Sequence, residues 1–253
     1  MTWNVTYHVK NKRFNDAVLI EGLPGIANVG KIAVDFMIDE LKARKLCSFT
    51  SDHLPQTVFI NEKGLLESPK IGLYYKRQKK GPDLIFLSGD VQPTNEVACH
   101  TLVSTIINLI PEFNIKEVYT TGGIGLQSVP DNPQVYATSN SADLQKKLAK
   151  KSYKINTEIY GVVGPVMGVT GVLVARSPVP AAALLAETFG HQMYLGVKGA
   201  KAITKCVSKL VTTKIDVKHL GKEVEDFENE VMQKTKELLK VAGAQPVDNH
   251  YIG

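Results

Sequence analysis

Short, almost uninterrupted apolar runs alternate along this chain of 253 residues with longer segments of helical periodicity. Ala17–Glu21 and Asp83–Ser88 are runs of the first kind, and strands of that composition are usually buried on both faces of a parallel sheet. Helical spacing of apolar residues follows them, over about Asn28–Ala43 and Thr94–Leu109. Buried strands that alternate with helices predict a three-layer α/β/α domain, because helices must then cover both faces of the sheet.

Further elements extend this pattern, and we expect residues 1–212 to form a single α/β/α core domain. Glu117–Thr121 is a predicted strand that ends at paired glycines, and Pro111 is expected to stop the helix before it. Alanine favours a helix over Ala181–Ala186, but the place of this segment in the alternation favours a strand. The other predicted segments are a strand-and-turn insertion at Thr57–Tyr75, a polar loop at Ser128–Ser141, a basic helix at Ala142–Lys151 and a helix at Lys198–Leu210.

Beyond this core the pattern changes to one long amphipathic helix, predicted over residues 213–242 and followed by a flexible tail over 243–253. A coiled-coil-like stripe on this helix has spacings of three and four and is apolar at all but one position. The stripe consists of Val217, Leu220, Val224, Phe227, Val231, Lys234, Leu238 and Val241. Such a stripe either docks on its own domain or faces a partner, and the sequence leaves both open.

Composition excludes several classes of protein. The chain is 43% apolar and 22% charged, and no apolar run approaches the roughly 18 residues of a membrane span. The polar segment Met1–Arg13 lacks the apolar stretch of a secretory signal. Its three cysteines, Cys47, Cys99 and Cys206, lie far apart, and the six histidines show no metal-ligand spacing. We therefore expect a cytoplasmic protein with no membrane association, no metal and no cofactor.

The formal net charge of +5 comes from two basic clusters. One contains Lys76, Arg77, Lys79 and Lys80, and the other contains Lys146, Lys147, Lys150, Lys151 and Lys154. Binding of nucleic acid would require stacking aromatic residues between such charges or a recognisable reading helix. Tyr74, Tyr75 and Tyr153 are adjacent to the clusters, but Tyr74 and Tyr75 lie in a strand-like run in which they are expected to pack. Solvated loop and helix faces are therefore the preferred interpretation, and no nucleic-acid partner is expected.

The sharpest local motif lies between the first strand and the first helix. Gly25 to Lys31 has the glycine and lysine spacing of a phosphate-binding loop, and Asp90, after a later strand, resembles the acid that holds magnesium in such proteins. Ile32 follows the lysine, however, where that loop requires a serine or threonine hydroxyl. A tight, closely packed turn is therefore preferred, and nucleotide binding is the less favoured alternative.

A second constellation could perform acid–base chemistry. Asp90, Glu96 and His100 follow the strand Asp83–Ser88, and His100 lies one helical turn beyond Glu96. The competing interpretation is a turn followed by a helix N-cap at Thr94 or Asn95. No nucleophile with an activating base is identifiable by spacing, so no catalytic residue is assigned.

These motifs, in this order, resemble the archaeal branch of the proteasome assembly chaperone family. The resemblance covers about residues 15–220. Its motifs are Gly22–Gly30, Leu84–Pro93, Val118–Gly123, Ile159–Gly164, Ala183–Thr188 and Ile215–Leu220. It implies a phosphorylase/hydrolase-like α/β/α core that acts as a non-catalytic chaperone. It also implies a homo-oligomer that associates with α subunits of the proteasome core particle. An enzyme on the same fold remains the alternative, because fold alone does not decide function.

Two regions would then bind the partner. The stripe would contribute Val224, Phe227, Val231 and Leu238, and the C-terminus would contribute His250, Tyr251 and Ile252. The chain departs from the family in two places. Gly196–Ala200 stands where members often carry Asp-Pro-x-Ala-Ala, and Tyr251 lies one position earlier than in the hydrophobic–Tyr–any ending of proteasome-docking tails.

Overall fold

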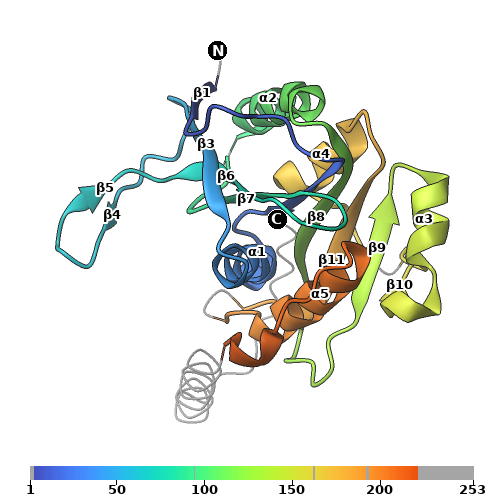
Figure 1. Cartoon of the computed structure of the whole chain (residues 1–253). Coiled ribbons are helices and arrows are strands. Elements are labelled where there is room, and N and C mark those ends of the chain that lie inside the picture. The colour runs from blue at the N-terminus through green and yellow to red at the C-terminus, as the bar shows by residue number, and fades with distance from the viewer. Residues whose placement is uncertain (1–2, 94, 162, 192–193, 222–253) are drawn as a thin grey trace, which may run out of the picture.

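A computed structural model describes residues 3–93, 95–161, 163–191 and 194–221 as one mixed sheet covered by helices on both faces (Figure 1). Across these residues the sheet order is β1-β3-β6-β7-β2-β8-β11-β9-β10, and β4 and β5 form a separate hairpin. The strands are β1 (Asn4–Tyr7), β2 (Ala17–Gly22), β3 (Arg44–Thr50), β4 (Phe59–Ile60), β5 (Leu66–Glu67), β6 (Ile71–Lys76), β7 (Leu84–Gly89), β8 (Ile115–Leu126), β9 (Val135–Ser139), β10 (Ile155–Asn156) and β11 (Ala181–Phe189). The helices are α1 (Val29–Glu40), α2 (Glu96–Glu112), α3 (Ala142–Leu148), α4 (Gly168–Arg176) and α5 (Val197–Leu210), with 3₁₀ turns η1 (Ile26–Asn28), η2 (Lys151–Tyr153) and η3 (Val217–His219).

The centre of the sheet is parallel, as its apolar composition predicts. β7, β2, β8 and β11 run in the same direction, and every residue of β2 and β7 is buried. Towards one edge β6, β3 and β1 pair antiparallel, and on the other side β9 pairs antiparallel with β11. The predicted α/β/α fold class is therefore confirmed, and Ala181–Ala186 belongs to a strand.

Two apolar layers lie on the two faces of the sheet. In β2, Leu19 points into the layer under α2 and α4, whereas Ile20 points into the layer under α1, α3 and α5. The first layer includes Leu102 of α2 and Leu173 of α4, and the second includes Met37 of α1. Because successive side chains of a strand point to opposite faces of the sheet, the same strands contribute residues to both layers.

Two predicted boundaries are wrong. α2 continues through Pro111 to Glu112, because so little helix follows the proline that its ring disturbs only the last turn, which the Phe113 N–H closes by donating to the Leu109 carbonyl at 3.0 Å. β8 does not end at Gly122 and Gly123, since its parallel pairing with β11 continues to Leu126 opposite Phe189.

Five elements lie where no element of that kind is predicted, namely β1, β3, β9, β10 and α4. β9 lies within the predicted loop Ser128–Ser141, where prolines and other turn residues precede it. The glycines of α4 obscure its helical character in the sequence, because glycine is a poor helix former. Gly171 approaches the Val166 carbonyl so closely that an added Cβ would lie 2.0 Å from that oxygen. β9 is held by its antiparallel pairing with β11, and α4 buries Val169 and Leu173 in the layer that it shares with α2, so tertiary contacts decide both segments.

The predicted long helix does not begin at Val217. The segment Val217–His219 forms one 3₁₀ turn that the Asp216 side chain caps, and Gly221 adopts a positive φ of 84°. Ile215 and Leu220 pack into the layer under α1 and α5. The predicted partner-binding residues Val224, Phe227, Val231, Leu238, His250, Tyr251 and Ile252 lie outside the described residues. Among the residues that are described, no helix is long and apolar enough to cross a membrane.

Candidate functional site: the carboxyl edge and an apolar arm

The carboxyl ends of the central parallel strands meet at one edge of the sheet, where α/β proteins usually bind ligands. The glycine loop after β2, Asp90 after β7 and the glycines of β8 all belong to this edge. Each could bind a ligand only if its polar groups were free of bonds within the protein.

The glycine loop is filled by the protein itself. A Cβ on Gly30 would lie 2.4 Å from the carbonyl oxygen of Thr121, and one on Gly22 would lie 2.3 Å from the carbonyl oxygen of Gly30. The Ala27 carbonyl accepts a hydrogen bond from the backbone N–H of Gly196 at 2.7 Å. These glycines therefore allow backbone segments to pack directly against one another.

The lysine of the loop is also engaged. The ammonium of Lys31 pairs with Asp35 at 2.7 Å, one helical turn along α1, and the other carboxylate oxygen of Asp35 accepts from the hydroxyl of Ser88. In a phosphate-binding loop the lysine reaches the phosphates. The geometry thus favours the closely packed turn over the nucleotide-binding loop.

This packing predicts unequal effects of alanine at two glycines of the loop. Gly30→Ala would force the Thr121 backbone away and lower the free energy of unfolding by about 1–3 kcal/mol. Gly25→Ala is the matched control, because a Cβ there meets nothing within 4 Å and its φ of −157° suits any residue. Urea unfolding of both variants measures the difference, and equal losses would contradict close packing as the reason for Gly30.

Asp90 is held by the backbone of a neighbouring strand. Its carboxylate accepts from the N–H of Lys70 at 2.9 Å, and its own N–H donates to the Lys70 carbonyl at 2.8 Å. Glu96 and His100 are exposed on α2, whose N-cap is Asn95, as one of the two sequence interpretations predicts. Within the described part of the chain, no hydrogen bond or ion pair joins Asp90, Glu96 and His100 to one another.

The sequence analysis missed a buried carboxyl group at this edge. Glu21, the penultimate residue of β2, is fully buried; its two carboxyl oxygens bond the N–H of Leu23 at 2.9 Å and the hydroxyl of Thr170 at 3.2 Å. Burial raises the pKa of this carboxyl to about 7, and the hydrogen bonds from Leu23 and Thr170 offset only part of that rise. The available signal was an acid placed directly after four apolar strand residues. Because the group is enclosed, it acts within the core, where it joins β2 to α4.

Glu21 predicts a pH dependence of stability. The folded state keeps the proton up to a pKa of about 7, whereas the unfolded chain releases it at the ordinary value of 4.5. The free energy of unfolding should therefore fall as the pH rises between these values, by about 3 kcal/mol in all, and then level off. Urea titrations across this window measure the slope. Glu21→Gln should reduce it, and an unchanged slope would contradict the assignment.

A projecting hairpin is the most exposed apolar feature of the described residues. β4 and β5 extend away from the sheet (Figure 1), and five large apolar side chains on or beside them are 40–75% exposed. This apolar arm consists of Val58, Phe59, Ile60, Leu65 and Leu66. Its turn is well defined, because the side chain of Asn61 accepts from the N–H groups of Lys63 and Leu65 at 3.0 Å.

The apolar arm has no core of its own. An isolated two-stranded hairpin is marginally stable in water, and contiguous exposed apolar surface usually marks a contact with another molecule. The strand-and-turn insertion predicted at Thr57–Tyr75 contains the arm, but its exposure follows only from the tertiary structure. The apolar pairs Phe59–Ile60 and Leu65–Leu66 flanking a turn were the signal that sequence reasoning did not use.

The fold and its surface define an α/β protein whose carboxyl edge is bonded internally and whose apolar arm the described residues leave exposed. The chain belongs to the PAC2 family, which it matches over residues 19–235. It is similar to Pyrococcus furiosus PbaB, described as an archaeal proteasome activator, with 27% identity and a TM-score of 0.83 over 93% of this chain and 99% of that one. Pyrococcus furiosus PbaA, described as an archaeal homolog of proteasome-assembly chaperone, shares the fold with 23% identity and a TM-score of 0.74 over 96% and 95%. A protein of Methanocaldococcus jannaschii named "Uncharacterized protein MJ1210" is 29% identical over 98% of this chain and 97% of its own length.

Proposed function

We propose that this protein is a non-catalytic, cytoplasmic proteasome assembly chaperone that acts as a homo-oligomer and binds proteasome α subunits or the α-ring. Membership of the PAC2 family supports the proteasome as the partner. The observation that carries the proposal is the apolar arm, which offers a hydrophobic contact surface that the described part of the chain does not cover.

The chemistry of the arm suits a contact that is made and later released. Burial of each large apolar side chain stabilises a complex by about 1.5–3 kcal/mol, so five of them suffice to offset a moderate cost of association. The charges in the hairpin balance, since Glu62 and Lys63 stand at the turn and Glu67 pairs with Lys70. Binding through the arm should therefore depend little on salt.

The C-terminal region supplies the second part of the proposal. The stripe residues Val224, Phe227, Val231 and Leu238 would join copies of the chain or contact the partner, and His250, Tyr251 and Ile252 would anchor the tail on the α-ring. An enzyme on the same fold is less favoured, because Glu21 is enclosed and the Asp90 carboxylate is bound to the Lys70 backbone.

Charges on the arm should weaken partner binding without unfolding the protein. Ile60→Asp combined with Leu66→Asp places two carboxylates where apolar contacts are proposed, and the affinity for purified α subunits should fall at least tenfold. The melting temperature should change little, because both side chains are exposed. Val97→Asp combined with Met167→Asp, at two exposed apolar positions outside the arm, is the matched control. Equal binding by the arm variant and the control would remove the arm from the proposal.

The stripe and the tail should contribute to different contacts, the stripe to self-association and the tail to binding of α subunits. Phe227→Asp with Val231→Asp should lower the oligomer mass measured by light scattering, whereas removal of residues 245–253 should leave that mass unchanged and weaken capture of α subunits. If both the oligomer mass and the capture were unchanged in the Phe227 and Val231 variant, the stripe would have no part in either contact.

A further inference from the structure

A shallow hollow of about 420 Å³ lies where the C-terminal end of α5 meets η2, at the opposite end of α5 from the carboxyl edge. Two lysines and several hydroxyl groups line this basic hollow, and no acidic side chain does: the polar lining consists of Lys209, Lys214, Ser152, Ser208, Thr212 and Thr213. Ammonium groups are donors for anionic oxygens. The hydroxyls of Ser208 and Thr213 already donate to the carbonyls of Thr213 at 2.6 Å and Val211 at 3.2 Å, so the lysines supply the charge that an anionic ligand would meet here.

Two hydrogen bonds bring distant segments of the chain to this hollow. The ammonium of Lys209 donates to the Ser152 carbonyl at 2.9 Å and joins α5 to η2. The side-chain amide of Gln78 donates to the Thr213 hydroxyl at 2.5 Å and joins the loop between β6 and β7 to the segment after α5. The two segments that carry the basic clusters of the sequence thus both contact residues of the hollow, through Gln78 and Ser152.

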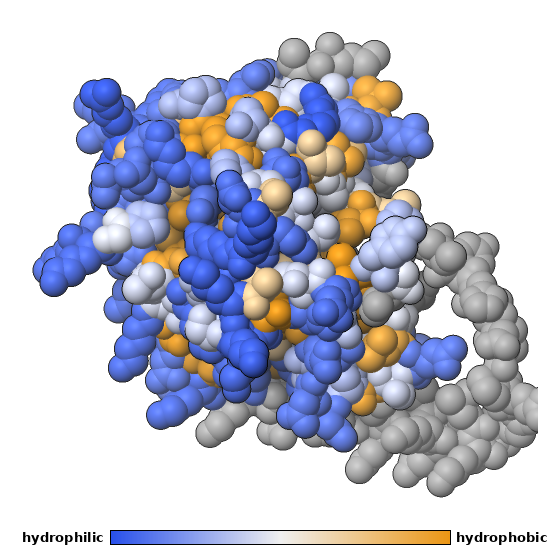
Figure 2. Space-filling view, turned by 90° about the vertical axis from the view of Figure 1, so that its right-hand side faces the viewer, coloured by the Kyte–Doolittle hydropathy of each residue, from blue (hydrophilic) through white to orange (hydrophobic). Residues whose placement is uncertain are grey.

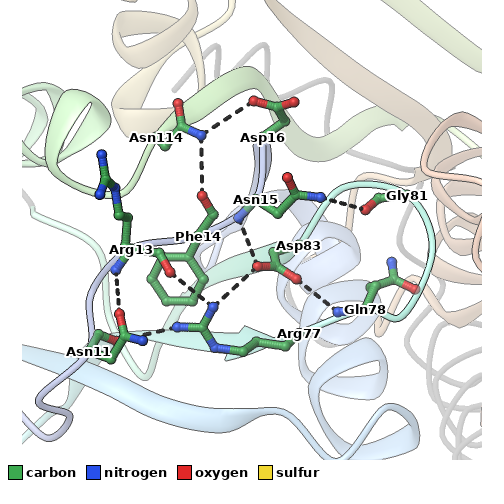
Figure 3. A network of polar contacts seen from close by, with 10 residues as sticks. All are labelled: Asn11, Arg13, Phe14, Asn15, Asp16, Arg77, Gln78, Gly81, Asp83 and Asn114. Atoms are coloured by element: carbon green, nitrogen blue, oxygen red, sulfur yellow. Dashed lines mark hydrogen bonds and ion pairs between the residues drawn. The ribbon is translucent and has the colours of Figure 1, made fainter.

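The loop between β6 and β7 has a rigid base. Arg77 lies over the ring of Phe14 at 4.6 Å, donates to the Arg13 carbonyl at 2.9 Å and pairs with the buried carboxylate of Asp83 at 3.5 Å (Figure 3). Asp83 also accepts from the N–H of Gln78 at 2.8 Å. The guanidinium of Arg77 is therefore occupied by contacts within the protein, whereas Lys79 and Lys80 of the same loop are exposed to solvent.

The lysines around the hollow carry their charge to solvent. The side of the molecule that bears α3 is largely hydrophilic (Figure 2), and Lys147 there pairs with Glu117 at 2.8 Å. Among the residues that the structure describes, no ion pair involves the exposed lysines that line the hollow or belong to the segments that contact it. These are Lys79, Lys80, Lys150, Lys151, Lys154, Lys209 and Lys214.

We propose that the basic hollow binds an acidic segment of a partner polypeptide, with one carboxylate in the hollow and its neighbours along the rim. Lysines act as flexible point charges and accommodate carboxylates at varied positions, whereas planar arginine forks favour phosphate. Tyr153 is the one aromatic residue of the lining, so the stacking platform that single-stranded nucleic acid requires is not formed there. This contact is independent of the apolar arm, and it would steer and orient the partner by charge.

The test measures binding of a fluorescent oligoglutamate peptide to the full chain by anisotropy. Lys151→Glu combined with Lys214→Glu should weaken binding at least tenfold, and the parent affinity should fall severalfold when salt rises from about 50 to 300 mM. Lys10→Glu combined with Lys63→Glu is the matched control, since it makes the same change in net charge at exposed lysines of other segments and should bind like the parent.

Three outcomes would overturn the proposal. The first is no binding of the peptide by the parent protein. The second is an equal loss in the control, which would show an effect of net charge alone. The third is tighter binding of an oligothymidylate that the same Lys151 and Lys214 substitutions abolish, which would assign the surface to nucleic acid. The melting temperature of each variant establishes that the exposed substitutions leave the fold intact. None of these results bears on the arm variants, so failure here is distinguishable from failure of the proposed function.

Discussion

Direct backbone contact between the start of α1 and β8 is the constraint on which the architecture depends. With no Cβ on Gly22 or Gly30, the first turn of α1 lies against β2 and against the Thr121 carbonyl of β8. Gly123 and Gly196 continue this contact, because a Cβ on either would meet the η1 backbone or Val29. Helix α5 can then pack beside α1 over the same face of the sheet. A motif with the spacing of a phosphate-binding loop thus serves packing, and the space that a phosphate would need is occupied by the protein.

The same edge shows how polar residues near a ligand-binding position can be used for structure. The buried carboxyl of Glu21 accepts a hydrogen bond from Thr170 and so joins β2 to α4. Asp90, after β7, accepts from the backbone of Lys70, directly before β6, and Lys31 forms an ion pair with Asp35 within α1. Each group could take part in catalysis if it faced an open cleft. Here each is satisfied by a neighbour in the chain and holds elements of the fold together.

The surface offers two kinds of contact that differ physically. The apolar arm projects hydrophobic side chains on a hairpin without a core, so its contact would be short-ranged and insensitive to salt. The basic hollow gathers lysines from distant segments, so its contact would be longer-ranged and weakened by salt. A chaperone could use the second to orient a partner and the first to hold it.

The sequence by itself determined the layered α/β class and most central elements, because buried strands and amphipathic helices leave apolar periodicities that depend on local residues alone. It also indicated the family through the order of its motifs. Only the tertiary structure decided that β8 continues through its glycines, that Gly168–Arg176 is helical and that Glu21 is enclosed, since each depends on neighbours far along the chain. The exposure of the arm and the approach of the β6–β7 loop and η2 to the end of α5 were decided in the same way. Both features depend on which distant segments lie side by side on the folded surface. Periodicity reports only on residues that are close in sequence, so it could not predict either of them.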